Sequence, residues 1–409
     1  MKGVLSIAGG TAIAQAITVL TAPILTRLYT PEQMGVWGLF LSFVGVASIA
    51  ATLRYELAIV AANSDADANA LTKSCLILTA ACAPVSALVL EAMRRAGSFH
   101  YSDLPSWAPA CAAIAVFGSA CGSTLRFYAA RLSAFTLVGR FTVLQAVARP
   151  ALQVLLSPLG TLGLLGGEAA GRCIGLSAYR KHLANLRHTT SLTRTLVIYR
   201  QFPLIQLPSS LLSTAALLAQ VPVFASIYGT QIAGYLALSQ RVVAMPVALL
   251  GSAIADVFYA RAGDLARTEP ALLRRYVLRT AAHLLLLILP LAAALLIAGP
   301  HLVAAIFGDA WAPSGQILCI FAPLMVAQFT VSSVSRAIYL TQKQHFRLLY
   351  DIAALCAQFL ILLIRPEDWR TAVYILSYSG TVLYVLFFVL LLHTLEPQAI
   401  RRATTASNP

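Results

Sequence analysis

Three long polar side chains recur at helical spacing within an otherwise apolar stretch, residues 136–156. Gln145, Arg149 and Gln153 are each four residues apart, so a helix would place them on one face. An arginine inside a bilayer-spanning helix costs about 2.5 to 3.5 kcal/mol on insertion scales, and such residues normally face protein or water. We expect this face to line a cavity and to bind substrate through all three side chains. The alternative is a structural arginine bonded to backbone carbonyls or a helix end.

A second polar group lies in the apolar stretch 162–179. Glu168 and Arg172 form an i, i+4 pair in the favourable order. This pair either neutralises itself, or Arg172 binds an anionic substrate while Glu168 couples transport to an ion. Glycine also recurs every fourth residue here, which predicts a seam of close helix packing. The glycines are Gly163, Gly167, Gly171 and Gly175.

Two further positions are candidates for substrate binding. Arg241 precedes Pro246, which permits a helix bend, and it could bind an anion or could instead extend toward an interface. Gln15 shares one helix face with two threonines, and it either faces the cavity or hydrogen-bonds between helices. Arginine outnumbers glutamate among these intramembrane charges, so we expect a cavity that favours anions.

Enzymatic chemistry has no positive signal in this sequence. The seven histidines show no paired metal spacing, and the seven cysteines lack CxxC spacing. No GxxxxGK[ST] phosphate loop and no nucleophile motif occur. The sequence therefore predicts no metal site, no cofactor and no ATPase activity of its own.

The elements that must position these residues are membrane helices. Of 409 residues, 59% are hydrophobic and 11% are charged, against roughly 25% charged in soluble domains. A bilayer-spanning helix needs about 20 apolar residues, and about twelve such stretches occur. The fold expected is an all-α integral membrane protein of two six-helix lobes around a central cavity. The expected spans are 4–25, 35–53, 74–90, 107–125, 136–156, 162–179, 202–228, 232–258, 280–298, 316–340, 348–364 and 372–392.

The net charge is +14, and most of the lysines and arginines lie between the apolar stretches. In that position they orient a membrane protein rather than bind nucleic acid. Most lysines and arginines fall on the side that carries both termini, so we expect both termini in the cytoplasm. Two longer connections on that side, 181–201 and 261–279, are amphipathic. Thr268-Glu269-Pro270 predicts a helix start in the second one.

An internal repeat supports a chain of two similar halves. Pro23 and Tyr29 recur as Pro222 and Tyr228, 199 residues later, and Gly35 recurs as Gly234 at the same offset. We therefore expect an N-terminal lobe at 1–180, a cytoplasmic linker at 181–201, a C-terminal lobe at 202–395 and a cytoplasmic tail at 396–409.

Three segments carry a family resemblance. They are Gly9-Gly-Thr-Ala-Ile-Ala-Gln15, Pro23-Ile-Leu-Thr-Arg-Leu-Tyr-Thr-Pro-Glu-Gln-Met-Gly35 and Leu53-Arg-Tyr-Glu-Leu-Ala-Ile59. They resemble Wzx-type oligosaccharide flippases of the multidrug/oligosaccharidyl-lipid/polysaccharide (MOP) exporter superfamily, whose members have twelve helices in two lobes. The residues that carry the motifs are Pro23, Arg27, Tyr29, Pro31, Gly35, Arg54, Tyr55 and Glu56.

The resemblance implies a flippase and not an enzyme. Its substrate would be an undecaprenyl-diphosphate-linked oligosaccharide, moved from the cytoplasmic to the periplasmic leaflet of a bacterial inner membrane by alternating access. The product would serve O-antigen, lipopolysaccharide, capsule or exopolysaccharide synthesis, with membrane lipids, a polysaccharide polymerase and a chain-length regulator as partners. A MATE-like small-molecule antiporter and a membrane-embedded polymerase or ligase are the alternatives. Arg149, Arg172 and Arg241 would bind the diphosphate, since arginine binds phosphate through multidentate hydrogen bonds.

Overall fold

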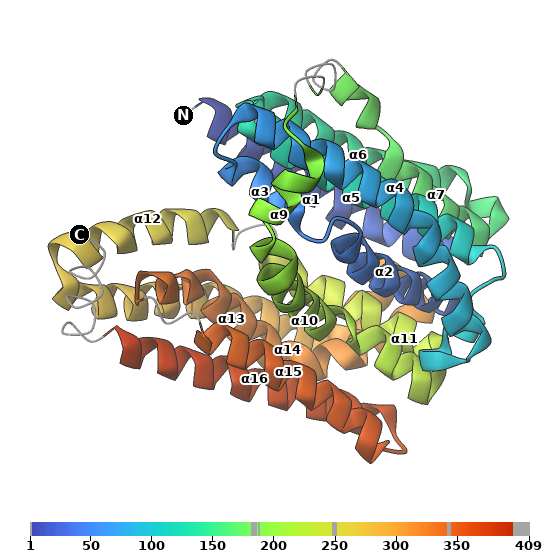
Figure 1. Ribbon diagram of the computed structural model, residues 1–409. Helices are drawn as coiled ribbons and strands as arrows, with labels where there is room; N and C mark the ends of the chain where they lie inside the picture. Colours follow the sequence, from blue (N-terminus) through green and yellow to red (C-terminus); the bar gives the residue numbers. More distant parts are fainter. Residues whose placement is uncertain (1, 181–185, 187–188, 248–251, 342–344, 396–409) are drawn as a thin grey trace. The chain divides into compact units, whose positions relative to one another are not determined.

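The computed structural model describes residues 2–180, 186, 189–247, 252–341 and 345–395 (Figure 1). These residues fold into helices and no β-strand occurs among them, which confirms the expected all-α class. The predicted tail at 396–409 and parts of the predicted linker, 181–185 and 187–188, lie outside the described residues. The chain forms two compact units, Met1–Gly234 and Tyr235–Pro409, and each is described by itself.

The first unit is a bundle of long helices with short connections. Its main pairings are α1 with α6, α4 with α5, α6 with α7 and α5 with α7. The elements are α1 (Lys2–Leu28), α2 (Pro31–Ala51), α3 (Tyr55–Ala61), α4 (Asp65–Arg95), η1 (Ser98–Asp103), α5 (Ala108–Arg131), α6 (Phe135–Leu155), η2 (Ser157–Leu159), α7 (Thr161–Cys173), η3 (Leu176–Tyr179), α9 (Leu192–Ile198), η5 (Phe202–Gln206), α10 (Leu207–Leu218) and the first part of α11 (Gln220–Pro246).

Local sequence signals set the start of α2. Thr30 caps the helix by accepting a hydrogen bond from the Gln33 backbone N–H, and the Gln33 side chain accepts one from the Thr30 N–H. This reciprocal capping box, with Pro31 at the first helical position, fixes where the chain turns from α1 into α2.

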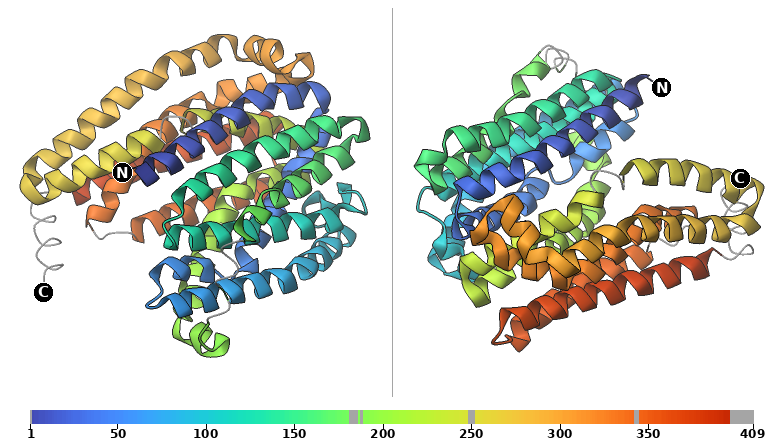
Figure 2. Two further views of the ribbon diagram at one scale, coloured as in Figure 1. Left: turned by 90° about the horizontal axis from the view of Figure 1, so that it is seen from above. Right: turned by 180° about the vertical axis from the view of Figure 1, so that it is seen from behind.

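The second unit contains the longest helix of the described chain. That helix, α13 (Pro270–Phe307), packs along α14 (Ala312–Val334), which in turn packs against α16 (Trp369–Thr394), as two further views show (Figure 2). The start of α13 at Pro270 confirms the helix start predicted from Thr268-Glu269-Pro270. The remaining elements are α12 (Ser252–Thr268), η7 (Asp309–Trp311), η8 (Ser335–Thr341) and α15 (His345–Ile364).

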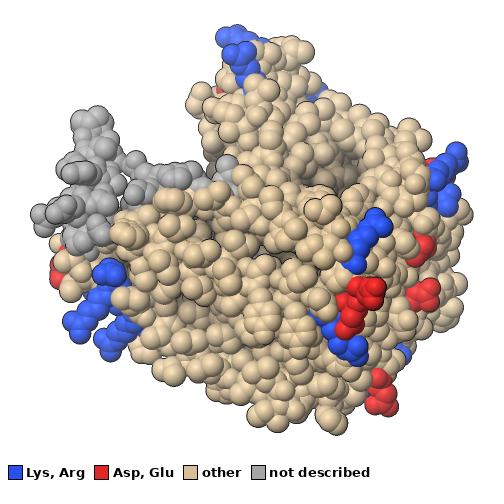
Figure 3. Space-filling view, turned by 90° about the horizontal axis from the view of Figure 1, so that it is seen from below, with Lys and Arg blue, Asp and Glu red and all other residues tan. Residues whose placement is uncertain are grey.

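Eight helical segments of the described chain are long and apolar enough to cross a bilayer. One of them, Phe202–Pro246, covers two expected spans and is interrupted by Gly229, whose φ is 82°. The expected spans at 136–156 and 162–179 correspond to α6, which carries charged and amide side chains, and to α7, which has 13 residues. In the face shown in Figure 3, uncharged residues dominate and the charged ones gather in a few clusters. This distribution suits a multi-pass membrane protein.

The repeat predicted from the sequence has a counterpart in the packing. Gly35 on α2 and Gly234 on α11 face each other closely within the first unit. A Cβ on Gly35 would meet the Thr230 carbonyl oxygen, and one on Gly234 would meet the Pro31 carbonyl oxygen. Thr230 lies 199 residues after Pro31, so both sides of this contact obey the offset of the repeat. The division into lobes at 1–180 and 202–395 itself stays a prediction.

Candidate functional site

Glycine brings α6 and α7 close enough to share one polar site. A Cβ on Gly171 would lie 2.6 Å from Arg149 Cγ, and one on Gly167 would lie 2.8 Å from the Gln153 backbone nitrogen. Gly163 and Gly175 make similarly close approaches to residues at 156 and 141–144. The predicted packing seam is therefore confirmed, and it places the polar faces of the two helices against each other.

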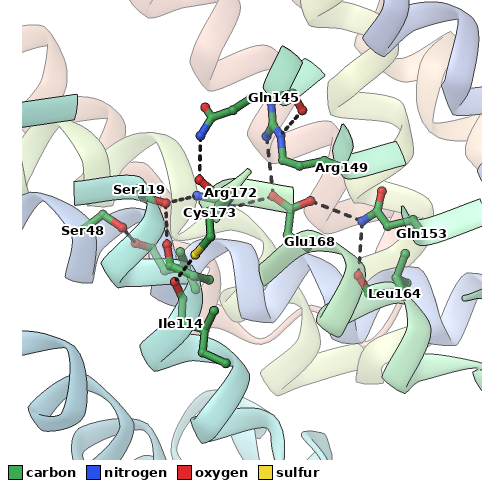
Figure 4. Close-up of polar contacts among 12 residues, drawn as sticks. Ser48, Ile114, Ser119, Gln145, Arg149, Gln153, Leu164, Glu168, Arg172 and Cys173 are labelled. Carbon is green, nitrogen blue, oxygen red and sulfur yellow. Dashed lines mark hydrogen bonds and ion pairs between the residues drawn. The ribbon is translucent and has the colours of Figure 1, made fainter. Parts of the chain in front are cut away.

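Glu168 lies at the centre of a hydrogen-bonded network, which we call the α6–α7 cluster, formed by Gln145, Arg149, Gln153, Glu168 and Arg172 (Figure 4). Arg172 Nε donates to Glu168 Oε1 at 2.7 Å, and Arg149 Nη1 lies 3.5 Å from the same oxygen. The other oxygen, Oε2, accepts from Gln153 Nε2 at 3.2 Å. Both carboxylate oxygens of Glu168 thus have partners.

Arg172 is held on three sides. Besides its bond to Glu168, its Nη1 donates to the Ser119 hydroxyl of α5 at 2.6 Å, and its backbone carbonyl accepts from Gln145 Nε2 at 2.7 Å. Glu168 and Ser119 fix the guanidinium between α7 and α5, and Gln145 of α6 holds the backbone of the same residue. Arg172 is therefore positioned as a rigid element of the cluster.

Arg149 is held less tightly than Arg172. Its Nε donates to the Gln145 carbonyl of its own helix at 3.2 Å. A bond to a backbone carbonyl is what the alternative of a structural arginine predicts. Its side chain nevertheless keeps 36% of its accessible surface, against 19% for Arg172 and 3% for Glu168. Two guanidinium groups face one carboxylate here, so the cluster carries an excess positive charge whose exposed part is Arg149.

Tyr29 connects the cluster to the start of α2. Its hydroxyl donates to the Gln153 carbonyl at 2.6 Å, and its side chain is buried. The family motif that contains Tyr29 therefore has a structural role at the candidate site. Sequence reasoning assigned Tyr29 to the motif but did not predict this contact, and it missed Ser119 because a serine in an apolar helix gives no signal of its own.

The remaining predicted positions are Gln15, Arg241 and Arg27. Gln15 is half-buried on α1, and none of the cluster's hydrogen bonds involves it. Arg241 is half-buried on α11, within the second unit. Arg27 is exposed at the end of α1. The structure therefore brings together five of the predicted site residues, while Gln15 makes none of their hydrogen bonds and Arg241 belongs to the other unit.

Metal binding has no support among the described residues, where no three His, Cys, Asp or Glu side chains gather into a possible site. The cluster's own donors are guanidinium and amide groups, which bind anions and hydroxyls rather than cations. The arrangement can therefore hold an anionic or polyhydroxylated group.

Residues 24–316, more than half of the chain, match the family of polysaccharide biosynthesis proteins. The chain belongs to this family. A search of curated protein sequences with this chain finds no match.

Several solved transporter structures share this fold. An inward-facing MATE family transporter of the MOP superfamily is 16% identical, with a TM-score of 0.62 over 96% of each chain. Lipid II flippase MurJ in an inward closed conformation is 13% identical, with a TM-score of 0.64 over 93% of this chain and 87% of that one. A MOP superfamily transporter from Pyrococcus furiosus is 13% identical, with a TM-score of 0.51 over 98% and 96% of the chains. The polysaccharide biosynthesis protein is therefore a multi-pass membrane protein that shares the fold of these transporters.

Proposed function

We propose that this protein flips an undecaprenyl-diphosphate-linked oligosaccharide from the cytoplasmic to the periplasmic leaflet of a bacterial inner membrane. The observation that carries the proposal is the α6–α7 cluster, in which two arginines share one buried carboxylate and Arg149 stays partly exposed. The family match supports a role in polysaccharide synthesis, and the likeness to MurJ supports the flippase fold.

Arg149 is the residue that meets the diphosphate in this proposal. Its 3.5 Å ion pair with Glu168 is longer than the 2.7 Å pair of Arg172. Exchange of Glu168 for a phosphate therefore costs Arg149 less interaction energy than it would cost Arg172. A planar guanidinium binds phosphate oxygens through parallel N–H donors. Arg172 adds positive charge from a fixed position, and Glu168 neutralises the excess while the site is empty.

The amides bind the sugar or orient the arginines. Gln145 is half-buried and holds the Arg172 carbonyl, and Gln153 holds Glu168. Arg241 and Gln15 are proposed as further substrate ligands from their positions in the sequence. The termini are proposed to lie in the cytoplasm, and the polymerase and chain-length regulator of surface polysaccharide synthesis are proposed to act on the product.

The test is leaflet exchange of a fluorescent polyprenyl-diphosphate oligosaccharide in liposomes that contain the purified protein. Charge-assisted hydrogen bonds contribute about 1.5 to 3 kcal/mol, so Arg149→Ala should slow exchange about 10- to 100-fold. Arg140→Ala is the matched control, because Arg140 is an exposed arginine of the same helix. Equal exchange by both variants would remove Arg149 from the site.

A drug antiporter is the second candidate, because the MATE transporter shares the fold over nearly the full chain. Such a protein would move an organic cation down its gradient in the same liposomes. Cation efflux without exchange of the lipid-linked sugar would overturn the flippase proposal and leave the arginines with a structural role.

A further inference from the structure

One face of α5 continues from the α6–α7 cluster toward the C-terminal end of that helix. Ser119 on this face accepts the 2.6 Å bond from Arg172, and a Cβ on Gly122 would lie 3.2 Å from the Phe141 ring of α6. Residues three and four apart share a helix face, so the next position on this face is Arg126. The face therefore leads from the cluster to a further arginine.

The surroundings of Arg126 leave its charge without compensation. Within the described ranges of the chain, Arg126 makes no hydrogen bond and no ion pair. Its side chain is open to solvent, although protein atoms surround much of it. The residue lies in α5, a candidate membrane span, where an arginine without a counter-ion is costly. An arginine at such a position normally faces water, a protein partner or an anionic ligand.

Arg126 faces a second cation. It interacts electrostatically with Arg149 of α6, the exposed arginine of the α6–α7 cluster. Arg149 shares Glu168 with Arg172, and both oxygens of that carboxylate already have partners. Two accessible guanidinium groups therefore repel each other here. An anion that carries charge at two points would relieve this repulsion.

The Tyr179 hydroxyl is a second unsatisfied group in the same region. It is buried and has no hydrogen-bond partner among the residues described. The ring packs in one cluster with Leu125 and Ala129 of α5 and meets Phe141 edge-on at 5.1 Å. Tyr179 also interacts electrostatically with Arg126. A buried hydroxyl without an acceptor is costly, so this group needs an acceptor.

We propose that Arg126 and the Tyr179 hydroxyl form a phosphate-binding subsite next to Arg149, and that this subsite takes the second phosphate of a diphosphate. Arg149 binds one phosphate. Arg126 binds the other through its planar N–H donors, and Tyr179 donates its O–H to the same group. The identity of the diphosphate lipid rests on the proposed function, whereas the subsite stands on the packing of α5, α6 and η3. Its consequence is selectivity for a diphosphate over a monophosphate.

Two simpler roles for Arg126 fit these contacts less well. A snorkelling arginine extends toward the membrane surface, but Arg126 lies on the helix face that approaches α6 and interacts with Arg149. A structural arginine bonds to backbone carbonyls, as Arg131 of the same helix does with Val60 and Ala62. Arg126 makes no such bond within the described chain. An anion is therefore the group that satisfies Arg126.

A phosphate can reach this subsite from a diphosphate substrate or from a phospholipid headgroup, since both offer the same oxygen acceptors. Phosphatidylglycerol has one phosphate, so it satisfies one guanidinium group. A diphosphate has two adjoining phosphates and satisfies Arg126 and Arg149 together. The number of phosphates therefore separates the two sources.

The first measurement is protection of arginines from phenylglyoxal, followed by mass spectrometry of the purified full-length protein in phospholipid-free detergent. Phenylglyoxal modifies accessible guanidinium groups, so Arg126 and Arg149 should both react. Inorganic diphosphate should slow modification of both, and inorganic phosphate at the same concentration should protect Arg126 less. Arg140 is the control that neither anion should protect. It is exposed on α6, nine residues before Arg149 and on the opposite face of that helix.

Equal protection of Arg126 by the two anions would overturn the selectivity, and no protection by diphosphate would overturn the subsite. Protection by phosphatidylglycerol as strong as that by diphosphate would assign the subsite to a lipid headgroup and contradict the proposal. These readouts use the unaltered protein, and they stay valid if it moves no lipid-linked sugar.

Tyr179→Phe tests the hydroxyl separately. It keeps the ring that packs against Phe141 and removes the O–H. Protection of Arg126 in this variant should need about 3- to 10-fold more diphosphate, as the loss of one hydrogen bond predicts. Unchanged protection would remove Tyr179 from the subsite.

The second measurement compares leaflet exchange of two polyprenyl-linked oligosaccharides, one with a diphosphate and one with a monophosphate. Arg126→Gln should slow exchange of the diphosphate lipid about 10- to 100-fold, because a charge-assisted hydrogen bond is lost. It should slow the monophosphate lipid less than about threefold, since Arg149 alone holds one phosphate. Arg126→Lys should restore part of the diphosphate rate, because it keeps the charge without the planar donors. Arg140→Gln should exchange both lipids as the wild type does.

Equal slowing of both lipids by Arg126→Gln would mean that Arg126 acts as a general positive charge or in folding, and would overturn the proposal. An unchanged rate for the diphosphate lipid would overturn it as well. Absence of exchange of either lipid by the wild type would refute the proposed function instead, and protection from phenylglyoxal would then decide the subsite by itself.

Discussion

The Tyr29 hydroxyl donates a 2.6 Å hydrogen bond to the Gln153 carbonyl, 124 residues further along the chain. It joins the turn between α1 and α2 to the helix that carries Arg149. The α6–α7 cluster is therefore anchored to the first helix pair as well as to α5, where Ser119 holds Arg172.

Tyr29→Phe should destabilise the protein by about 1 to 3 kcal/mol, because it leaves a buried carbonyl without its donor. The measurement is thermal unfolding of the protein in detergent. Tyr199→Phe is a comparison, since the Tyr199 hydroxyl accepts a bond from the Asn63 backbone N–H rather than donating one. An unfolding temperature of Tyr29→Phe equal to that of the wild type would mean that this bond adds nothing to stability.

The same bond should show an alkaline pH dependence. Burial raises the pKa of Tyr29, which lies between two candidate spans. A group whose folded pKa is raised contributes stability that is complete below its unfolded pKa, about 10 for tyrosine, and that contribution is lost as pH rises through the folded value. The stability difference between wild type and Tyr29→Phe should thus shrink at alkaline pH. A difference that grows with pH would contradict this sign.

Gly171→Ala should separate α7 from α6. Its Cβ would lie 2.6 Å from Arg149 Cγ and 2.7 Å from Arg149 Cα, so the backbone of one helix must move. Overpacking of this kind costs about 1 to 3 kcal/mol. Gly166→Ala is the matched control, since a Cβ there meets nothing within 4 Å on the same helix. The unfolding temperature of Gly171→Ala should be well below that of Gly166→Ala. Equal unfolding temperatures would mean that the glycine seam does not limit how closely α6 and α7 pack.

Glu168→Ala should destabilise the protein more than Arg149→Ala does. Removal of one partner from a buried ion pair costs about 3 to 5 kcal/mol, because the opposite charge stays buried. Glu168 is almost fully buried and neutralises Arg172, whereas Arg149 is partly exposed. Unfolding in detergent tests this order. The reverse order would show that Arg149, rather than Glu168, holds the cluster together.

Gly35→Ala should be among the most damaging small substitutions in α2. Its Cβ would meet the Thr230 carbonyl of α11, a backbone atom, so one of the two helices must shift. We expect a loss of about 1 to 3 kcal/mol or more in stability and a lower yield of folded protein. Gly263→Ala, where a Cβ meets nothing within 4 Å, provides the control. Folded yields that match for both variants would contradict the close approach.

Local periodicity predicted much of the candidate site. Gln145, Arg149 and Gln153 share a face because they are four residues apart, and Glu168 pairs with Arg172 for the same reason. The adjacent glycines predicted which face of α7 another helix approaches. Spacing within one helix could therefore forecast side-chain geometry.

Partners from distant segments could not be predicted in this way. Ser119 and Tyr29 reach the cluster through the packing of α5 and of the α1–α2 turn, which depends on long-range contacts. Arg241 gave the same sequence signal as Arg149, yet it lies in the other unit.

The contact between Gly35 and Gly234 has the form of an isologous interface, in which the same patch contributes to both sides. Identical subunits related by a twofold axis make contacts of this kind, where each partner offers residue i to residue j and j to i. Here one chain supplies both patches at an offset of 199 residues. This is the trace that fusion of two copies of a self-associating half-length ancestor would leave. Because each glycine faces a backbone carbonyl, Thr230 for Gly35 and Pro31 for Gly234, a change at the equivalent position 199 residues away cannot make room for a larger residue.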